Sequence, residues 1–410
     1  MKYVILLGDG MADYPVEKLG GKTPLEFAKT PNMDMIAAEG TLGLVDTIPA
    51  GFTPGSDVAN LSVLGYNPEK YFTGRGPLEA ASMGVELDAG DVAFRCNLVT
   101  LGSGNNNNIM ENFNADHITS GEAKEIIEAL NKELGAETIY FYPGVSYRHL
   151  MVWNKECVSI NTTPPHDIVG QDIQSYLPRG NDSEKIRNLM SRSQEILKDH
   201  PVNISRIAAG KRPANSIWLW GEGRAPDMEP MTRKYHIKGG MISAVDLLNG
   251  IGAYAGLNII HVEGATGYTD TDYLGKAKKA LKFLKENDFV FIHVESIDEM
   301  GHEGNIEGKI KALEDFDNMV VGTILDNIGK LGEFRVLVLG DHPTPVSLKT
   351  HISDPGPFAV YSSLDGENLC SGKSFGETNA GESGIMISPG HHLMNHFIVD
   401  WKKFIEEKRN

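Results

Sequence analysis

Residues 289–302 read FVFIHVESIDEMGH, a mostly apolar run that is followed at once by acidic and imidazole side chains. Four further runs have the same apolar character: YVILL (3–7), IWLW (217–220), LNIIHV (257–262) and RVLVL (335–339). Continuous runs of this kind, rich in Val, Ile and Leu, are typical of strands that are buried on both faces of a parallel sheet. The sequence therefore predicts a set of buried parallel strands.

Helical patterns separate these strands along the chain. We expect helices at residues 23–39, 56–64, 241–254, 271–286, 309–329 and 394–407. The first of them begins with Thr23-Pro24, an N-cap residue followed by proline at the first helical position. The alternation of strands and helices indicates an α/β fold with a mostly parallel sheet between helices.

The middle of the chain interrupts this alternation. It contains Pro164-Pro165 and a polar helical pattern at 182–198, and the order of strand and helix resumes at residue 215. A chain of 410 residues is also too long for one ordinary core. We therefore expect a core domain formed by residues 1–87 and 215–410, and a smaller α/β domain, residues 88–214, inserted into it.

The amino-acid composition excludes some classes of binding partner. The chain has 38 Lys and Arg against 55 Asp and Glu, a net charge of −17. This argues against nucleic acid, which basic surfaces bind, but not against a small phosphorylated substrate. The sequence has no apolar run of about 18 residues and no apolar stretch typical of a signal peptide. Cys96, Cys157 and Cys370 form no disulfide framework, so we expect a cytoplasmic protein without membrane contact and leave its oligomeric state open.

Polar side chains follow three of the predicted strands. In chain order they are Asp9, then Asp298 with His302, then Asp341 with His342. Ligands of open α/β sheets bind at the carboxyl ends of the strands, so we expect these side chains to converge at one edge. His351, nine residues after His342, is a sixth candidate.

Carboxylate and imidazole groups together are the ligands of Zn²⁺, Mn²⁺ and related divalent ions. Three carboxylates at one sheet edge would repel each other unless cations lay between them. The alternative for any single Asp is a turn residue or an N-cap, and Asp341-His342 could belong to the turn before Pro343. The recurrence at three strand ends favours a dinuclear metal site.

Ser56 is the candidate nucleophile, in the segment GFTPGSDVANLSVLGYNP (51–68). The glycines and proline before it form a tight turn, and a helix is expected to begin at the serine. The free N–H groups of a helix N-terminus favour an oxyanion or a bound phosphate, and a neighbouring cation lowers the pKa of a hydroxyl group. The alternative is that Ser56 is only an N-cap.

Basic side chains in and near the inserted region could bind an anionic substrate. We rank Arg95, Arg148, Arg206 and Lys238 above Arg179 and Lys234. Arginine binds carboxylate and phosphate groups through two parallel hydrogen bonds, which suits such a substrate. Any one of these residues could instead be a solvated surface charge.

Several motifs resemble those of the archaeal type of cofactor-independent, or 2,3-bisphosphoglycerate-independent, phosphoglycerate mutases, a family of the alkaline phosphatase superfamily. The motifs are GDGMADYP, TPNMD, GFTPGSDVANLSVLGY, GRGPLEAA, DEMGHEG, GDHPTP and THISDPGPF. The resemblance covers nearly the whole chain and is weakest over residues 100–214. It implies an alkaline-phosphatase-like core.

The resemblance also implies two divalent ions, commonly Mn²⁺, with Mg²⁺, Zn²⁺ or Co²⁺ as substitutes. One ion would be held by Asp9, Ser56, Asp341 and His342, and the other by Asp298, His302 and His351. Ser56 would be transiently phosphorylated. His117 stands where many archaeal relatives have an arginine, and it is implied as a contact of the substrate.

The activity so implied is the interconversion of 3-phosphoglycerate and 2-phosphoglycerate in glycolysis and gluconeogenesis. The inserted domain would close as a lid, exclude water and hold the glycerate through its arginines. A phosphatase, phosphodiesterase or phosphopentomutase could share the same metal core. A protein that only binds a phosphorylated ligand is a further alternative, but it would need a missing metal ligand, and every expected position is filled.

Overall fold

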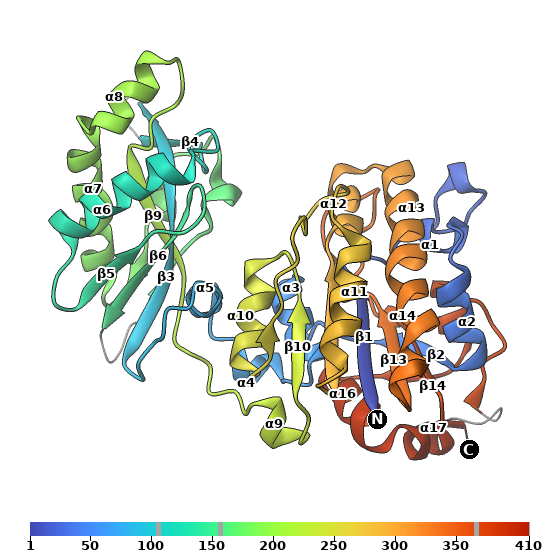
Figure 1. Cartoon of the computed structure of the whole chain (residues 1–410). Coiled ribbons are helices and arrows are strands. Elements are labelled where there is room, and N and C mark those ends of the chain that lie inside the picture. The colour runs from blue at the N-terminus through green and yellow to red at the C-terminus, as the bar shows by residue number, and fades with distance from the viewer. Residues whose placement is uncertain (104–107, 155–158, 365–368, 410) are drawn as a thin grey trace. The chain divides into compact units, whose positions relative to one another are not determined.

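The structure is a computed structural model that describes residues 1–103, 108–154, 159–364 and 369–409, so that Cys157 lies outside the described residues. The chain divides into two compact units (Figure 1). The larger unit comprises Met1–Phe72 and Asp227–Asn410, and the smaller unit comprises Thr73–Pro226.

An eight-stranded sheet forms the centre of the larger unit, with the strand order β11-β10-β12-β1-β13-β14-β2-β15. Its strands are β1 (Lys2–Gly8), β2 (Thr41–Val45), β10 (Gly239–Ile242), β11 (Asn258–Ile259), β12 (Phe289–Val294), β13 (Phe334–Leu339), β14 (Gly356–Ser362) and β15 (Met386–Ile387). β14 is antiparallel to both of its neighbours, and the other neighbouring strands pair in parallel. The expected α/β fold with a mostly parallel sheet is confirmed.

Helices surround this sheet. They are α1 (Pro24–Phe27), α2 (Pro31–Glu39), α3 (Ser56–Val63), α4 (Pro68–Tyr71), α9 (Met231–Lys234), α10 (Asp246–Tyr254), α11 (Tyr273–Leu284), α12 (Ser296–Glu303), α13 (Ile306–Asp315), α14 (Gly322–Ile328), α15 (Glu377–Glu382), α16 (Leu393–Asn395) and α17 (Trp401–Arg409). Val4 and Leu6 of β1 share a core with residues of α2, α11 and α14. Ile5 and Leu7, which point to the opposite face, are also fully buried. Both faces of the central strands are therefore covered, as their continuous apolar sequences require.

Four expected helices are divided in the structure. The last of them, expected at 394–407, contains the π-helical stretch His396–Asp400 between α16 and α17. The helix expected at 23–39 is interrupted between α1 and α2, where Pro31 begins the second helix. The segment 241–254 starts as strand β10 and becomes helical only at Asp246. The segment 309–329 contains a π-helical stretch, Phe316–Val321, between α13 and α14. Local apolar periodicity does not distinguish such interruptions from one continuous helix.

The smaller unit has an antiparallel sheet and its own apolar core. Its strands are β3 (Asp91–Ser103), β4 (Asn108–Asn112), β5 (Ile139–Tyr142), β6 (Arg148–Asn154) and β9 (Ser216–Gly223), with the short pair β7 (Ile160–Asn161) and β8 (Arg179–Gly180). Its helices are α5 (Arg75–Ser82), α6 (Ser120–Leu134), α7 (Ser183–Lys198) and α8 (Pro201–Ala208).

This unit is wider than the segment 88–214 expected from the sequence. Helix α5 packs on β3 and β9, so the unit begins before residue 88. The IWLW run lies in β9, which pairs antiparallel with β3 instead of joining the parallel sheet. An apolar run predicts a buried strand, but it does not say which sheet the strand joins.

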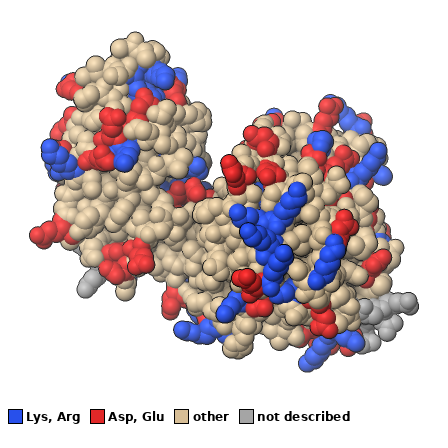
Figure 2. All heavy atoms as spheres, in the orientation of Figure 1, with Lys and Arg blue, Asp and Glu red and all other residues tan. Residues whose placement is uncertain are grey.

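Charge is unevenly distributed over the surface. Lys278, Lys279, Lys282 and Lys285 in and after α11 are exposed, and Figure 2 shows basic side chains gathered over this helix. Acidic side chains are spread over both units in the same view. Among the described residues, no helix combines the length and the apolar composition that a membrane span requires.

Candidate active site

The carboxyl ends of three neighbouring strands position the candidate metal ligands. β1 lies between β12 and β13 and is parallel to both, with Gly8 opposite Val294 and Leu7 opposite Leu339. The residues that follow these strands therefore emerge at the same edge of the sheet. Helix α12 begins two residues after β12 and presents Asp298 and His302, four residues apart, on one face.

The first group surrounds Asp9. His342 Nε2 lies 3.6 Å from Asp9 Oδ1 and 3.6 Å from Asp341 Oδ2. The Ser56 hydroxyl oxygen lies 3.4 Å from Asp9 Oδ2 and 3.3 Å from His342 Nε2. Asn60 Nδ2 donates a 2.9 Å hydrogen bond to Asp341 Oδ2, which ties that carboxylate to α3. The four residues of one expected ligand set thus lie together.

The second group surrounds Asp298. His302 Nε2 lies 3.1 Å from Asp298 Oδ2, and His351 Nε2 lies 3.5 Å from Asp298 Oδ1. The two Nε2 atoms are 2.8 Å apart. Thr344 Oγ1 donates a 2.5 Å hydrogen bond to Asp298 Oδ1. Two imidazole nitrogens that converge on one carboxylate fit the ligand chemistry of a divalent cation.

His342 lies within reach of both groups. Two sets of three residues each offer ligand atoms that lie within 4.8 Å of one another inside the set. One set is Asp298, His342 and His351, and the other is Asp9, His293 and Asp341. The structure therefore shows Asp and His groups that could hold metal ions. It also adds His293, which the sequence analysis did not consider.

The electrostatics of this edge favour cations. Burial and the charges of neighbouring carboxylates raise the pKa of Asp9 well above its usual range, and burial together with Asp298 raises the pKa of Glu295 to about 8. Burial also opposes ionisation of Asp298, but hydrogen bonds from His302 and His351 outweigh it and hold the pKa of Asp298 well below its usual range. Bound cations would relieve the repulsion among these carboxylates.

One buried oxygen supports the same conclusion. Asp9 is fully buried, and its Oδ1 accepts no hydrogen bond from the described residues. Leaving a buried acceptor unpaired costs about 1–3 kcal/mol. The residues present fit a metal centre, because a cation beside Asp9 Oδ1 would satisfy this oxygen.

Ser56 is the first residue of α3 and does not cap it. Gly55 occupies the N-cap position, and no side chain caps the helix. The Ser56 hydroxyl group instead faces Asp9 and His342, at the distances given above. The interpretation of Ser56 as an N-cap is therefore wrong, and its hydroxyl group belongs to the candidate metal centre.

The smaller unit contains a cluster of guanidinium groups around Trp220. The Cζ atoms of Arg95 and Arg75 lie 4.7 Å and 5.9 Å from the centre of the Trp220 ring, and the His166 ring lies 5.4 Å from it. Burial, together with the charges of Arg75 and Arg148, lowers the pKa of Arg95, although Glu79 acts in the opposite direction. Positive charges gathered in this way would attract an anion.

His117 and Arg148 meet at Tyr147 in the same unit. The His117 ring lies 6.4 Å from the Tyr147 ring, and Arg148 Cζ lies 5.8 Å from it. Phe113 links this pair to the cluster through contacts with Tyr147 and His166. Three of the expected substrate-binding residues, Arg95, Arg148 and His117, therefore lie on one connected cluster.

Arg206 does not join this cluster. Its guanidinium group donates to the backbone oxygens of Arg212 and Ala115 and to Glu122 Oε2, 2.9 Å away. The side chain is 2% exposed. These bonds fix α8 against the segments before and within α6, so the donors of Arg206 are engaged within the smaller unit, and its contact with the substrate stays a prediction.

Lys238 lies at the wrong edge of the sheet for the expected role. It directly precedes β10, whose first residue, Gly239, pairs with Phe289, the first residue of β12. The candidate metal ligands lie beyond the last residue of β12, about 20 Å away at 3.3 Å per strand residue. The sequence showed that Lys238 lies where the chain returns to the core domain. It did not show at which end of the sheet the residue lies.

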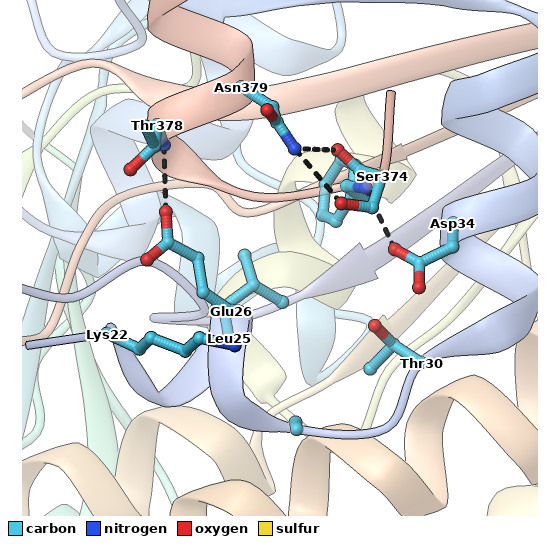
Figure 3. Close-up of a pocket in the computed structure, with 10 residues that line it drawn as sticks. Lys22, Leu25, Glu26, Thr30, Asp34, Ser374, Thr378 and Asn379 are labelled. Atoms are coloured by element: carbon cyan, nitrogen blue, oxygen red, sulfur yellow. Dashed lines mark hydrogen bonds between the residues drawn. The ribbon is translucent and has the colours of Figure 1, made fainter. Parts of the chain in front are cut away.

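A cavity of about 290 Å³ in the larger unit lies apart from the candidate metal ligands. Its walls come from the region of α1 and α2 and from residues near α15 (Figure 3). The polar groups in its wall bond to one another: Thr378 N donates to Glu26 Oε1, and Asn379 Nδ2 donates to Ser374. None of the expected site residues lines this cavity.

Known proteins match this chain closely. Residues 37–203 match the family model described as 2,3-bisphosphoglycerate-independent phosphoglycerate mutase. The protein of that name from Methanosarcina mazei is 56% identical over 363 residues, which cover 88% of this chain and 90% of the relative. A probable mutase of the same name from Geobacter sulfurreducens is 51% identical over 394 residues, which cover 96% and 98%.

The chain belongs to the family of 2,3-bisphosphoglycerate-independent phosphoglycerate mutases. Solved structures agree with this membership. The cofactor-independent phosphoglycerate mutase of Thermoplasma acidophilum is 25% identical with a TM-score of 0.67, and the match covers 97% of this chain and 99% of that one. A protein of Pyrococcus horikoshii is 30% identical with a TM-score of 0.81 over 97% and 96% of the two chains.

Two residues of this phosphoglycerate mutase fold were not predicted from the sequence. Arg75 stands in the motif GRGPLEAA, but it precedes the expected boundary at 88 and was not considered as a contact of the substrate. His293 lies inside the apolar run of β12, where a histidine is more often a core residue. For Arg75 the one available signal was a charged residue within a recognisable motif. For His293 it was an ionisable residue within an apolar strand.

Proposed function

We propose that this chain interconverts 3-phosphoglycerate and 2-phosphoglycerate by moving the phosphoryl group to Ser56 and back, without 2,3-bisphosphoglycerate. The observation that carries this proposal is the position of the Ser56 hydroxyl group. Its oxygen lies 3.3–3.4 Å from His342 and Asp9, two residues of the group that can hold a cation. A cytoplasmic location is part of the same proposal, as expected of a glycolytic enzyme.

The metal centre would hold two divalent ions, with Mn²⁺ as the first candidate. We assign Asp9, Ser56, Asp341 and His342 to one ion, and Asp298, His302 and His351 to the other. His342 Nε2 lies 3.3 Å from the Ser56 hydroxyl oxygen and 3.6 Å from both Asp9 and Asp341, which supports its assignment to the first ion, although His342 also offers a ligand atom within 4.8 Å of those of Asp298 and His351. When bound, the ions would lower the pKa of the Ser56 hydroxyl group and neutralise charge on the phosphoryl group.

In the first half of the reaction, the Ser56 oxygen attacks the phosphorus of 3-phosphoglycerate in line with the leaving oxygen. The bond from phosphorus to Ser56 Oγ forms, and the bond to the oxygen on carbon 3 of glycerate breaks. The released oxygen takes up the proton that the serine has lost. Asp9 and His342 hold the Ser56 oxygen in place for this attack.

In the second half, the 2-hydroxyl group of the same glycerate attacks the phosphoserine. The hydroxyl loses its proton, the bond from phosphorus to Ser56 breaks, and the serine oxygen regains a proton. Glycerate must stay bound between the two halves. We propose that the guanidinium cluster of Arg75, Arg95 and Arg148 binds its carboxylate, since arginine binds carboxylate groups bidentately.

The purified chain should therefore convert 3-phosphoglycerate to 2-phosphoglycerate when Mn²⁺ is present and 2,3-bisphosphoglycerate is absent. ³¹P NMR distinguishes the two phosphoglycerates and inorganic phosphate in one experiment. We expect 2-phosphoglycerate to accumulate to equilibrium with little inorganic phosphate, and removal of the metal by a chelator to stop the conversion. Inorganic phosphate as the main product would instead identify a phosphatase.

A further inference from the structure

His293 is a fully buried histidine beside the candidate metal centre. It lies in the penultimate position of β12, opposite Leu7 of β1. Its Nε2 atom is 2.9 Å from Asp9 Oδ2, and its Nδ1 atom is 3.3 Å from the hydroxyl oxygen of Ser243. Both ring nitrogens therefore have a polar partner.

The two partners determine where the ring carries its proton. Val245 N donates a 3.0 Å hydrogen bond to the Ser243 hydroxyl oxygen, so the hydroxyl hydrogen is directed elsewhere and can be donated to His293 Nδ1. A bound cation would hold Asp9 in its ionised form, which is only an acceptor, so the 2.9 Å contact with Asp9 then requires a hydrogen on His293 Nε2. Both contacts select the neutral ring with its proton on Nε2.

We infer that His293 is a positioning residue that orients Asp9 toward the metal, and is not itself a metal ligand. The hydrogen bond from Nε2 engages Asp9 Oδ2 and leaves Oδ1 unpaired among the described residues. Oδ1 is the oxygen on the side of His342, 3.6 Å away. The arrangement assigns Oδ1 to the metal, whereas Oδ2 accepts from the histidine and also lies 3.4 Å from the Ser56 hydroxyl oxygen.

This inference excludes a competing interpretation of the same geometry. Asp9, His293 and Asp341 offer ligand atoms within 4.8 Å of one another, so His293 could in principle complete a three-ligand metal site. A nitrogen that carries a hydrogen has no lone pair to give to a cation. Glu295 Oε2 also lies 3.6 Å from Nε2, but the shorter contact with Asp9 takes the hydrogen.

The backbone around His293 holds the ring in this position. The buried Lys276 of α11 donates a 3.0 Å hydrogen bond to the backbone oxygen of His293. Asn249 Nδ2 lies 3.4 Å from the backbone oxygen of Ser243. Lys276 thus holds the backbone of His293, and Asn249 holds its partner Ser243. Such support is expected for a residue that acts by orienting a ligand.

The inference rests on the cation binding proposed above, and its test measures metal binding instead of turnover. Metal-free protein is titrated with Mn²⁺, and free Mn²⁺ is followed by electron paramagnetic resonance. We expect two sites in the unmodified protein. In His293→Leu, one of them should weaken by roughly 10–100-fold, the usual effect of losing a partner that orients a ligand. His293→Gln, whose amide can still donate to Asp9, should bind within a few-fold of the unmodified protein.

A matched control uses the other unit. His149 of β6 is also a histidine buried on a strand, at 1% exposure, and its Nδ1 accepts a hydrogen bond from Gly144 N. His149→Leu should leave both Mn²⁺ affinities unchanged. Equal affinities in His293→Leu and in the unmodified protein would overturn the inference, whereas an unmodified protein that binds no Mn²⁺ would overturn the proposed metal centre together with it.

A second measurement reads the hydrogen on the His293 ring directly in the unmodified protein and uses His293→Gln only to assign the signal. In protein labelled with ¹⁵N-histidine, the chemical shifts of the two ring nitrogens report which of them carries hydrogen. We expect His293, assigned by its absence in His293→Gln, to keep its hydrogen on Nε2 before and after addition of diamagnetic Mg²⁺. Loss of that hydrogen when the metal binds would show that His293 is a ligand and that the inference is wrong.

Discussion

Replacement of Ser56 by alanine should abolish the interconversion of the two phosphoglycerates. The substitution removes the oxygen that attacks phosphorus, and loss of a nucleophile in an enzyme with a covalent intermediate typically lowers kcat by roughly 10⁴-fold or more. The rate is measured by ³¹P NMR at saturating 3-phosphoglycerate with Mn²⁺ present. An alanine variant with more than a small fraction of the original rate would rule out the phosphoserine step.

The fold should survive this change. Gly55, not Ser56, is the N-cap of α3, and the serine side chain caps no helix. Ser62→Ala in the same helix provides a control with the opposite expected result, a loss of stability without a loss of turnover. The Ser62 hydroxyl group donates a 2.6 Å hydrogen bond to the backbone oxygen of Thr47, so its loss should cost about 1 kcal/mol of stability while turnover continues. The two variants separate the chemical role of a hydroxyl group from a structural one.

Replacement of Lys309 by methionine should lower the free energy of unfolding of the larger unit by about 3–5 kcal/mol. Lys309 is fully buried in α13. Its Nζ donates to Asp13 Oδ2 over 2.8 Å and to the backbone oxygen of Thr344 over 2.9 Å. Without the lysine, Asp13 would remain as a buried charge without its cation. Urea unfolding followed by a probe in the larger unit measures the change.

Two further variants test the cause of this loss. Lys309→Met combined with Asp13→Asn removes both charges, so the double variant should be more stable than Lys309→Met alone. Lys311→Met, on the same helix, removes an exposed lysine that pairs with Asp315, and should change stability by no more than about 0.5 kcal/mol. If Lys309→Met were as mild as Lys311→Met, the buried pair would have no structural importance.

The pair also connects stability to the metal centre. Lys309 joins the segment after β1, through Asp13, to the segment after β13, through Thr344. Thr344 Oγ1 in turn donates to Asp298 Oδ1. The loops that carry ligands are therefore held by a buried charge as well as by the sheet, so Lys309→Met should also weaken metal binding.

The convergence of the three candidate carboxylate ligands could be predicted from the sequence because each of them follows a recognisable strand. Asp9, Asp298 and Asp341 come after buried apolar runs, and a parallel sheet brings the carboxyl ends of such runs to one edge. The local sequence is therefore enough to predict that these three carboxylates lie close together. Ser56 was predictable for a similar reason, since it directly follows a glycine turn at the start of a helix.

The remaining residues depend on partners that are far away in the sequence. His293 acts through Asp9, which is 284 residues away, so its run of apolar neighbours indicated only a strand. Arg206 bonds to Glu122 and Ala115, 84 and 91 residues away, and nothing near it showed that its donors were already engaged. Lys238 was expected to bind substrate because the chain re-enters the core near it. The sequence did not show that it lies at the end of the parallel sheet opposite to the candidate metal ligands. Single-sequence patterns do not record such long-range pairs.

Detection of phosphate on Ser56 during turnover would show that the phosphoryl group passes through this serine. The protein is mixed with 3-phosphoglycerate and Mn²⁺, quenched in acid within the first turnovers, digested and mapped by mass spectrometry. This route predicts phosphate on the peptide that contains Ser56, and none when the substrate is omitted. Formation of 2-phosphoglycerate at full rate with no phosphate on Ser56 at any quench time would contradict it.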